Sequence, residues 1–292
     1  MQIDHALILC AGLGTRMGEI GKKLPKALWP VYFKSLLELQ INYCQDLGIK
    51  RIFINIHFLA DEIENFIHSH PRLDITLLHE DPILDSGGAI HNMASRGDVN
   101  YMGNLLVVNA DQFLLFDHQY YQKALQLLSS SRAVLFGIKV NRDAHYNETV
   151  IKDNLLTNIK KPDGLSDYIT YSGLGLLKLD NLYPVAGATK FFQTVANYQK
   201  EQVRFVTPDT YEYWDFGTSD IYCENIKKIA VLLKDKYSSN SLILKFLKQH
   251  GALNGNEQNF YCDEMNSINL EGRGQFVKNS LVGKGIIQVV ET

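Results

Sequence analysis

The chain has 292 residues, of which 46% are hydrophobic and 21% are charged, and its formal net charge is −3. This composition is typical of a globular protein with a substantial core and excludes a disordered chain. The nearly balanced charge indicates neither a nucleic-acid partner nor a membrane-surface partner, and no apolar run approaches the ~20 residues that span a bilayer.

Cysteine usage and the first residues bear on the compartment. The four cysteines are scattered and form no C-x-x-C pair; they are Cys10, Cys44, Cys223 and Cys262. Scattered cysteines are typical of a reducing compartment rather than of a disulfide framework or a structural zinc site. The chain enters its first apolar run without the basic head of a signal peptide. We therefore expect a cytoplasmic protein.

Apolar runs and helical patterns alternate along the chain, which predicts an α/β fold. We expect strands at residues 5–9, 49–56, 74–79, 105–108, 133–140 and 203–206, with short strands and loops between 141 and 175. We expect helices at residues 35–47, 61–68, 118–129, 189–200 and 219–236, the last beginning at a serine N-cap. The continuous apolar run 105–108 is typical of a central strand covered on both faces.

The pattern changes after Lys236, which predicts a boundary between a larger domain, residues 1–236, and a C-terminal appendage, residues 237–292. The appendage is expected to hold one helix at 240–250 and short β segments. Residues 279–285 resemble one coil of a hexapeptide-repeat left-handed β-helix. A single coil has no stacked neighbour to supply its core, so a β tail packed on the larger domain is the alternative.

A glycine-rich, basic loop runs from Cys10 to Lys26, between the first predicted strand and the first predicted helix. Glycines stand at positions 12, 14, 18 and 21, and Arg16, Lys22, Lys23 and Lys26 carry positive charge. Glycine lets backbone N–H groups turn toward an anion, and a loop between a strand and a helix is a usual phosphate site. The combination suits a triphosphate.

Two common phosphate motifs fail in this loop. The dinucleotide fingerprint G-x-G-x-x-G has Met17 at its third glycine, and the Walker A pattern has Arg16 at its first glycine and Lys23 at its Ser/Thr. The loop instead resembles the signature of the sugar-phosphate nucleotidylyltransferases. That signature reads (L/C)-A-G-x-G-T-R-(L/M), a spacer, then P-K-(P/A)-L-x-P-V, and it stands here at residues 9–17 and 25–31.

Two aspartates extend the resemblance. Asp111 follows the central strand, and a carboxylate at the carboxyl end of a parallel strand points into the crevice where α/β proteins bind ligands. An isolated aspartate is more often a helix cap or a loop residue, but in this family the strand typically ends in N-G-D, whose acid binds magnesium. Ala110 replaces that glycine here. Asp215 lies in a segment that resembles W-x-D-x-G-T-P-x-x-Y, whose acid completes the metal site in the family.

Three further segments resemble motifs that recognise the substrates. Residues 85–89 resemble the loop that reads the nucleobase, and residues 171–175 resemble a segment that lines the sugar pocket. Lys161-Pro162 resembles E-K-P, whose lysine holds the sugar phosphate, with Lys160 at the glutamate position. A cation there favours an acidic sugar such as N-acetylmuramate 1-phosphate, unless Lys160 points to solvent.

The resemblance implies a Rossmann-like, mixed and mostly parallel sheet flanked by helices. It implies an Mg²⁺-dependent enzyme that joins a sugar 1-phosphate to an NTP, with likeness to the branch of mannose 1-phosphate guanylyltransferases (GTP) and N-acetylmuramate 1-phosphate uridylyltransferases (UTP). The implied catalytic residues are Arg16, Lys26, Asp111 and Asp215, the two aspartates being the metal ligands. The implied nucleotide site is Leu9, Ala11, Gly12, Gly14, Thr15, Arg16, Lys26, Asp85, Gly87 and Gly88. The implied sugar-phosphate site is Asn109, Lys160, Lys161, Ser172 and Gly173.

Three alternatives stay open. A dinucleotide-dependent oxidoreductase requires the missing third glycine and an acid at the end of the second strand, where the chain has Asn55-Ile56-His57. A catalytically silent regulatory homologue is compatible with the substitutions at Ala110 and Lys160. A cytidylyltransferase acting on a non-sugar phosphate such as phosphocholine is the third. The sequence also leaves open the nucleobase, the sugar and whether the chain forms a homo-oligomer.

Overall fold

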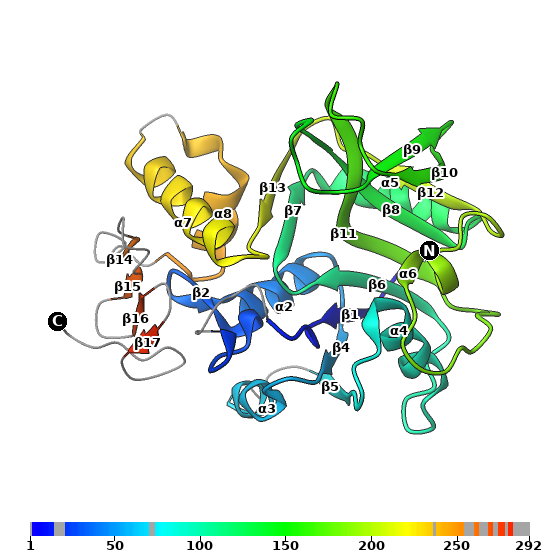
Figure 1. The fold of residues 1–292 in the computed structure, drawn as a ribbon, viewed down its shortest axis with the longest axis horizontal. Coiled ribbons are helices and arrows are strands. Elements are labelled where there is room, and N and C mark those ends of the chain that lie inside the picture. The colour runs from blue at the N-terminus through cyan, green and yellow to red at the C-terminus, as the bar shows by residue number, and fades with distance from the viewer. Residues whose placement is uncertain are drawn as a thin grey trace.

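The computed structural model describes residues 2–14, 21–69, 74–235 and 238–253, and four short strands beyond them (Figure 1). A mixed nine-stranded sheet forms the centre of the molecule, and helices pack around it. Within these described ranges, no helix combines the length and the apolar character that crossing a lipid bilayer requires.

The central sheet has the strand order β5-β4-β1-β6-β11-β8-β12-β10-β9. Its strands are β1 (His5–Leu9), β4 (Arg51–Ile56), β5 (Asp74–His79), β6 (Asn104–Asn109), β8 (Ala133–Val140), β9 (Glu148–Lys152), β10 (Leu155–Lys160), β11 (Tyr168–Lys178) and β12 (Val203–Val206). The first four in the order run parallel, and β12 runs parallel to β8. β11 pairs antiparallel with β6 and β8, and β9 pairs antiparallel with β10 at one edge. The predicted α/β fold with a mixed sheet is confirmed.

Helices connect the strands, and some of them begin at side-chain caps. The helices are α2 (Leu36–Asp46), α3 (Ala60–His68), α4 (Asp85–Ser95), α5 (His118–Leu128), α6 (Phe191–Thr194), α7 (Ser219–Lys234) and α8 (Leu242–Gln249), with 3-10 turns η2 (Lys26–Leu28) and η3 (Ser238–Asn240). Ser35 caps α2 by accepting from the Glu38 N–H at 3.1 Å. Such caps satisfy the backbone donors that a helix leaves unpaired at its start.

Two hydrophobic cores lie on opposite faces of the sheet. Successive residues of a strand face opposite sides, so Leu106 and Val108 of β6 enter the larger core, whereas Leu105 and Val107 enter the smaller one. The apolar run 105–108 is therefore a central strand covered on both faces, as the sequence predicts.

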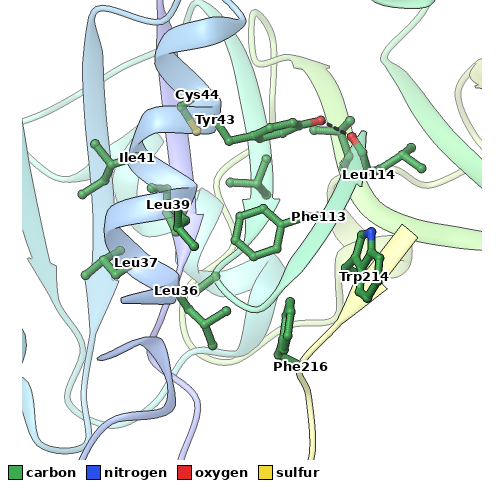
Figure 2. Packing of buried hydrophobic residues seen from close by; sticks show 14 of the residues in the cluster. Leu36, Leu37, Leu39, Ile41, Tyr43, Cys44, Phe113, Leu114, Trp214 and Phe216 are labelled. Atoms are coloured by element: carbon green, nitrogen blue, oxygen red, sulfur yellow. Dashed lines mark hydrogen bonds between the residues drawn. The ribbon is translucent and has the colours of Figure 1, made fainter. Parts of the chain in front are cut away.

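A separate two-stranded sheet pairs β7 (Gln112–Phe116) with β13 (Tyr211–Asp215) antiparallel, and this register sets Asp215 opposite Gln112. Phe113 of this sheet packs edge-on against Phe216, with ring centroids 6.1 Å apart. Figure 2 shows the Phe113 ring beside α2, and the hydroxyl of Tyr43 in this helix donates to the Leu114 carbonyl at 2.6 Å. The larger core therefore supports the ends of the strands next to both candidate metal ligands.

The first part of the expected appendage packs on this larger core. Glu212 of β13 accepts hydrogen bonds from the N–H groups of Leu242, at 2.6 Å, and Ile243, at 3.0 Å, and so caps α8. Phe246 and Leu247 of α8 are buried among residues of the larger core. The domain boundary after Lys236 stays a prediction.

Four strands follow α8: β14 (Phe260–Cys262), β15 (Ile268–Leu270), β16 (Gly274–Val277) and β17 (Ser280–Val282). They pair antiparallel in sequence order, and β14 contacts α7. Coils of a left-handed β-helix stack parallel instead. These strands are therefore a meander, in line with the alternative of a β tail, and the β-helix-like segment 279–285 extends outside the described residues.

Two expected helices differ from the structure. The helix expected at 189–200 is reduced to α6, and Asn197 Oδ1 accepts from the Gln199 N–H at 3.2 Å. Such side-chain-to-backbone bonds compete with helix formation. α7 is capped by Thr218, whose Oγ1 accepts from the Ile221 N–H at 3.3 Å, rather than by Ser219.

Candidate active site

The carboxyl ends of β1 and β6 lie side by side, because Leu9 and Asn109 are register partners in a parallel pair. The Ala110 N–H donates to the Leu9 carbonyl at 3.3 Å, and the Cys10 N–H donates to Asn55 Oδ1 of β4 at 2.8 Å. The glycine loop and Asp111 therefore leave the sheet at the same edge, which is where parallel α/β sheets bind ligands.

A cavity of about 160 Å³ lies at this edge. It is lined by Leu9, Cys10, Gly12, Leu13, Gly14, Lys26, Ala27, Ala110, Asp111 and Gly217. The Lys26 ammonium pairs with Asp111 Oδ2 across its wall, and Gly14 has a φ of 62°, which favours glycine. Ala11 is buried, and Thr15 and Arg16 lie outside the described residues. The structure thus brings Lys26, Asp111 and two loop glycines together, a cluster suited to phosphate.

The carboxylates of Asp111 and Asp215 converge at Gly217. The Phe216 N–H donates to the Asp111 carbonyl at 2.8 Å, and the Gly217 N–H donates to Asp215 Oδ1 at 2.7 Å. A side chain added at Gly217 would meet Asp215 Oδ1 at 2.7 Å and Asp111 Oδ2 at 3.4 Å. Only glycine at this position leaves open the small space that both carboxylates face.

This pair of carboxylates suits Mg²⁺. Magnesium is held by one or two carboxylates together with substrate phosphates and water, rather than by a closed cage of protein ligands. Among the described residues there is no cluster of three or more His, Cys, Asp or Glu side chains that could form such a cage. The donor set therefore fits a magnesium ion shared with a bound nucleotide, and metal binding stays a prediction.

Two residues near Asp215 were not among the predicted site residues. Tyr146 donates its hydroxyl to Asp215 Oδ2, and Gln112 Nε2 donates to the same oxygen at 3.1 Å. Burial, followed by the hydrogen bond to Asp215, raises the pKa of the Tyr146 hydroxyl, which therefore stays a donor at neutral pH. Gln112 directly follows Asp111, which is a usable sequence signal, whereas Tyr146 lies in a stretch without periodicity.

A larger cavity of about 640 Å³ adjoins the first one at Leu9. Its walls include Leu9, Ser86, Val107, Asn109, Ile159, Tyr171, Lys190, Phe191, Phe192, Gln193, Asn197, Tyr198 and Gln199. The rings of Tyr171 and Phe191 stack with an interplanar angle of 2° and centroids 5.7 Å apart. Aromatic faces and neutral amides are suited to a ligand that combines apolar surface with hydrogen-bonding groups.

The predicted base-reading loop is packed against the chain itself. A side chain at Gly87 would meet the Thr189 carbonyl at 2.6 Å, and one at Gly88 would meet the Gly187 carbonyl at 2.5 Å. The N–H groups of Gly87 and Gly88 both donate to Thr189, at 2.9 and 3.2 Å. The room that these glycines leave is filled by the segment 187–189, and Ser86 is the loop residue that lines the larger cavity.

Asp85 begins α4 with a left-handed φ of 60° and pairs with Lys190. Burial raises the pKa of the Asp85 carboxyl, but hydrogen bonds from Lys190 and from the Ser86 N–H outweigh it, so the pKa lies below its usual value. The pair links the start of α4 to the start of α6, beside the mouth of the larger cavity.

The predicted sugar-phosphate residues lie in different surroundings. Asn109 lines the larger cavity. Gly173, with a φ of 88°, packs against the Asn109 side chain. Ser172 is buried, and its hydroxyl donates to the Phe136 carbonyl at 2.8 Å, so its assignment to the sugar site stays a prediction. Lys160 pairs with Glu148 at 3.2 Å across the β9–β10 register, and Lys161 is exposed.

Comparison with known proteins gives a family match and several relatives. The model of the nucleotidyl transferase family matches residues 5–154. The D-glycero-alpha-D-manno-heptose 1-phosphate guanylyltransferase of Campylobacter jejuni is 27% identical over 223 residues, which are 75% of this chain and 96% of that protein. The N-acetylmuramate alpha-1-phosphate uridylyltransferase of Caulobacter vibrioides is 30% identical over 112 residues, 36% of this chain and 45% of that protein.

The fold is also found in solved structures. The crystal structure of HddC from Yersinia pseudotuberculosis complexed with GMP-PN superimposes with a TM-score of 0.65 at 21% identity. The match covers 78% of this chain and all of that chain. At this level of identity the likeness concerns the fold alone.

Proposed function

The chain belongs to the nucleotidyl transferase family, and we propose that it joins a sugar 1-phosphate to a nucleoside triphosphate, giving a nucleoside diphosphate sugar and pyrophosphate. The observation that carries this proposal is the convergence of Asp111 and Asp215 at Gly217, beside the glycine loop and Lys26. Two hard oxygen donors and a cation beside a glycine loop form a site for the phosphates of a nucleotide.

The reaction needs positioning more than proton transfer. A phosphate oxygen of the sugar 1-phosphate attacks the α-phosphorus; the new P–O bond forms as the bond to the β-phosphate oxygen breaks, and pyrophosphate leaves with its electron pair. The nucleophile is already an anion, so no strong general base is required. The barrier lies in bringing two polyanions together and in stabilising charge on the α-phosphate.

Each basic residue has a place in this proposal. Asp111 and Asp215 would hold Mg²⁺, which would supply positive charge to neutralise the phosphates. Lys26, already at Asp111, contributes a second positive charge at the α-phosphate. Arg16 binds the departing pyrophosphate through its planar guanidinium, and Lys161 binds the phosphate of the sugar.

We assign GTP and a neutral, manno-configured sugar 1-phosphate as the substrates. The guanylyltransferase relative aligns with three quarters of this chain, whereas the uridylyltransferase relative aligns with about a third. The positive charge of Lys160 is met by Glu148, so Lys160 gives little reason to expect an acidic sugar. UTP with N-acetylmuramate 1-phosphate is the competing pair.

Pyrophosphate release from a matrix of substrates tests the proposal. GTP, UTP, CTP and ATP are each combined with mannose 1-phosphate, a manno-heptose 1-phosphate, N-acetylmuramate 1-phosphate and phosphocholine. We expect release with GTP and one of the two neutral sugars. Nucleotide binding without release in any combination would instead establish a silent regulatory homologue and overturn the proposed activity.

A further inference from the structure

A chain of hydrogen bonds runs from Asp215 to the larger cavity through Gln112. Asp215 Oδ1 accepts from the N–H of Gly217, which lines the smaller cavity, and Gln112 Nε2 donates to Asp215 Oδ2 at 3.1 Å. Gln112 Oε1 in turn accepts from Asn109 Nδ2 at 2.6 Å. Asn109 lines the larger cavity. The chain therefore runs from the candidate metal ligand to the wall of the larger cavity.

The direction of these bonds is fixed by Asp215. An ionised carboxylate can only accept hydrogen bonds, whereas an amide side chain can donate at one end and accept at the other. Asp215 already accepts from the Gly217 N–H and from Tyr146. Gln112 must therefore present its NH2 group to Asp215 and its carbonyl to Asn109.

The Gln112 carbonyl determines the orientation of the Asn109 side chain. The Gln112 carbonyl can only accept, so Asn109 must turn its NH2 group toward it. The remaining polar atom of the side chain is Asn109 Oδ1, an acceptor, and no described residue donates to it. An isolated asparagine does not specify which of its two amide atoms is the oxygen. Here the Asp215 carboxylate determines it, because Gln112 bonds to both Asp215 and Asn109.

The backbone holds Gln112 and Asn109 in place. Gly173 of β11 lies against both side chains at a φ of 88°. A side chain there would collide with Gln112 Oε1 and approach Asn109 Nδ2 to 2.6 Å. The β7–β13 register fixes Gln112 opposite Asp215. Little freedom remains for either amide to turn over.

We propose that Gln112 is a positioning residue that makes Asn109 Oδ1 an obligate acceptor for a hydroxyl of the ligand in the larger cavity. The inference rests on the proposed function, which supplies two hydroxyl-bearing ligands: the sugar of the sugar 1-phosphate and the ribose of the nucleotide. An acceptor fixed in this way favours a ligand with a hydroxyl at the contacted position over the analogue that lacks it, because the deoxy analogue leaves the acceptor unpaired.

The test measures discrimination against deoxy analogues. In one arm, kcat/KM is compared for mannose 1-phosphate and its monodeoxy analogues; in the other, calorimetry compares GTP with 2′-deoxy-GTP and 3′-deoxy-GTP. The wild type is expected to discriminate against one analogue by about tenfold to a hundredfold. The arm in which this occurs identifies the sugar or the ribose as the source of the hydroxyl.

Three variants separate the proposed role from a merely structural one. Asn109→Leu and Gln112→Met should each bring the discrimination ratio close to one, while Gln126→Met, at an exposed position of α5, should leave it unchanged. A purely structural role of Gln112 would lower affinity for parent and analogue equally and leave the ratio intact.

Failure of the catalytic activity and failure of the Asn109 contact give different results. Absence of turnover with every substrate pair would contradict the proposed activity. Calorimetry would still give the ratio of affinities for GTP and its deoxy analogues. An unchanged ratio in Asn109→Leu in both arms overturns the inference, even if the enzyme is active. Because Gln112→Met could destabilise the β7–β13 pair, its thermal midpoint is measured, and Asn109→Leu serves as the independent variant.

Discussion

The ammonium group of Lys26 pairs with Oδ2 of Asp111 although 85 positions separate them in the sequence. Lys26 opens the short turn η2 at the end of the glycine loop, and Asp111 follows the central strand β6. The pair joins the two halves of the smaller cavity: the loop suited to phosphate and the carboxylates suited to a metal ion.

Replacing this lysine tests whether the pair is catalytic. Lys26→Met keeps most of the aliphatic length but removes the charge at the proposed α-phosphate position. We expect kcat to fall by about a hundredfold to a thousandfold, as for loss of one preorganised donor at developing charge. Steady-state pyrophosphate release provides the measurement, with Lys34→Met as the control because Lys34 instead pairs with Glu38. Equal rates in the two variants would place Lys26 outside the reaction.

A substitution at Arg16 tests whether the glycine loop binds the triphosphate. Arg16→Lys retains the positive charge but loses the planar fork that binds two phosphate oxygens at once. We expect a clear loss of kcat/KM for the nucleotide, measured by pyrophosphate release and by nucleotide binding. If both the rate and the nucleotide affinity are unchanged, Arg16 does not contact the triphosphate.

Substitutions in the Glu148–Lys160 ion pair test whether Lys160 takes part in sugar recognition. Lys160→Glu sets two acids facing each other across β9 and β10, whereas the double change Glu148→Lys with Lys160→Glu restores an ion pair of opposite orientation. Partly exposed pairs contribute little to stability, about 0–1 kcal/mol, so the fold should persist in both variants. We expect kcat/KM on neutral sugars to change less than tenfold in the double variant.

A selective loss on N-acetylmuramate 1-phosphate in Lys160→Glu, with mannose 1-phosphate unaffected, would contradict this account. It would revive the idea that Lys160 recognises an acidic sugar. Parallel kcat/KM values for the two sugars provide the measurement.

Tyr43 gives a test of the core that supports the site. Its hydroxyl donates to the Leu114 carbonyl, and burial raises the pKa of this phenol well above its usual value (Figure 2). Because the pKa of Tyr43 is higher in the folded than in the unfolded state, its burial stabilises the protein fully at pH below about 10, the unfolded value. This stabilisation is lost as the pH rises from there toward the folded-state pKa. Tyr43→Phe should cost about 1 kcal/mol at pH 7.

The difference in unfolding free energy between the wild type and Tyr43→Phe should become smaller at alkaline pH. Urea unfolding at pH 7, 9 and 10.5 should show wild-type stability falling more steeply above pH 10 than that of Tyr43→Phe. Identical pH dependence of the two proteins would show that Tyr43 does not contribute to the alkaline loss.

Sequence reasoning found the residues that stand next to strand ends. Asp111 follows an unmistakable buried strand, and the glycine loop follows the first strand, so the parallel pairing of β1 and β6 places them together. It did not find the Glu148–Lys160 pair, because the register of β9 and β10 shifts between Leu156 and Asn158. A one-residue irregularity decides which side chains face each other, and it leaves no pattern in the sequence.

The glycines of α4 show a second limit. A pair such as Gly87-Gly88 indicates that another group approaches the backbone closely. The resemblance to the family implies that this group is a nucleobase. The structure fills the space there with the carbonyls of Gly187 and Thr189, from a segment a hundred positions away. Glycine reports that space is needed but not which part of the molecule, or which ligand, takes it.

In the proposed reaction, Asp111 and Asp215 act together on the phosphates of one nucleotide. The most direct measurement is ³¹P NMR of a mixture of GTP, Mg²⁺ and the active sugar 1-phosphate, with wild-type enzyme, Asp111→Asn and Asp215→Asn in parallel. We expect equimolar pyrophosphate and nucleoside diphosphate sugar from the wild type. In each variant the rate should fall by several orders of magnitude, because losing charge neutralisation costs several kcal/mol. Near-wild-type turnover by either variant, or release of inorganic phosphate in place of pyrophosphate, would rule out the proposed reaction.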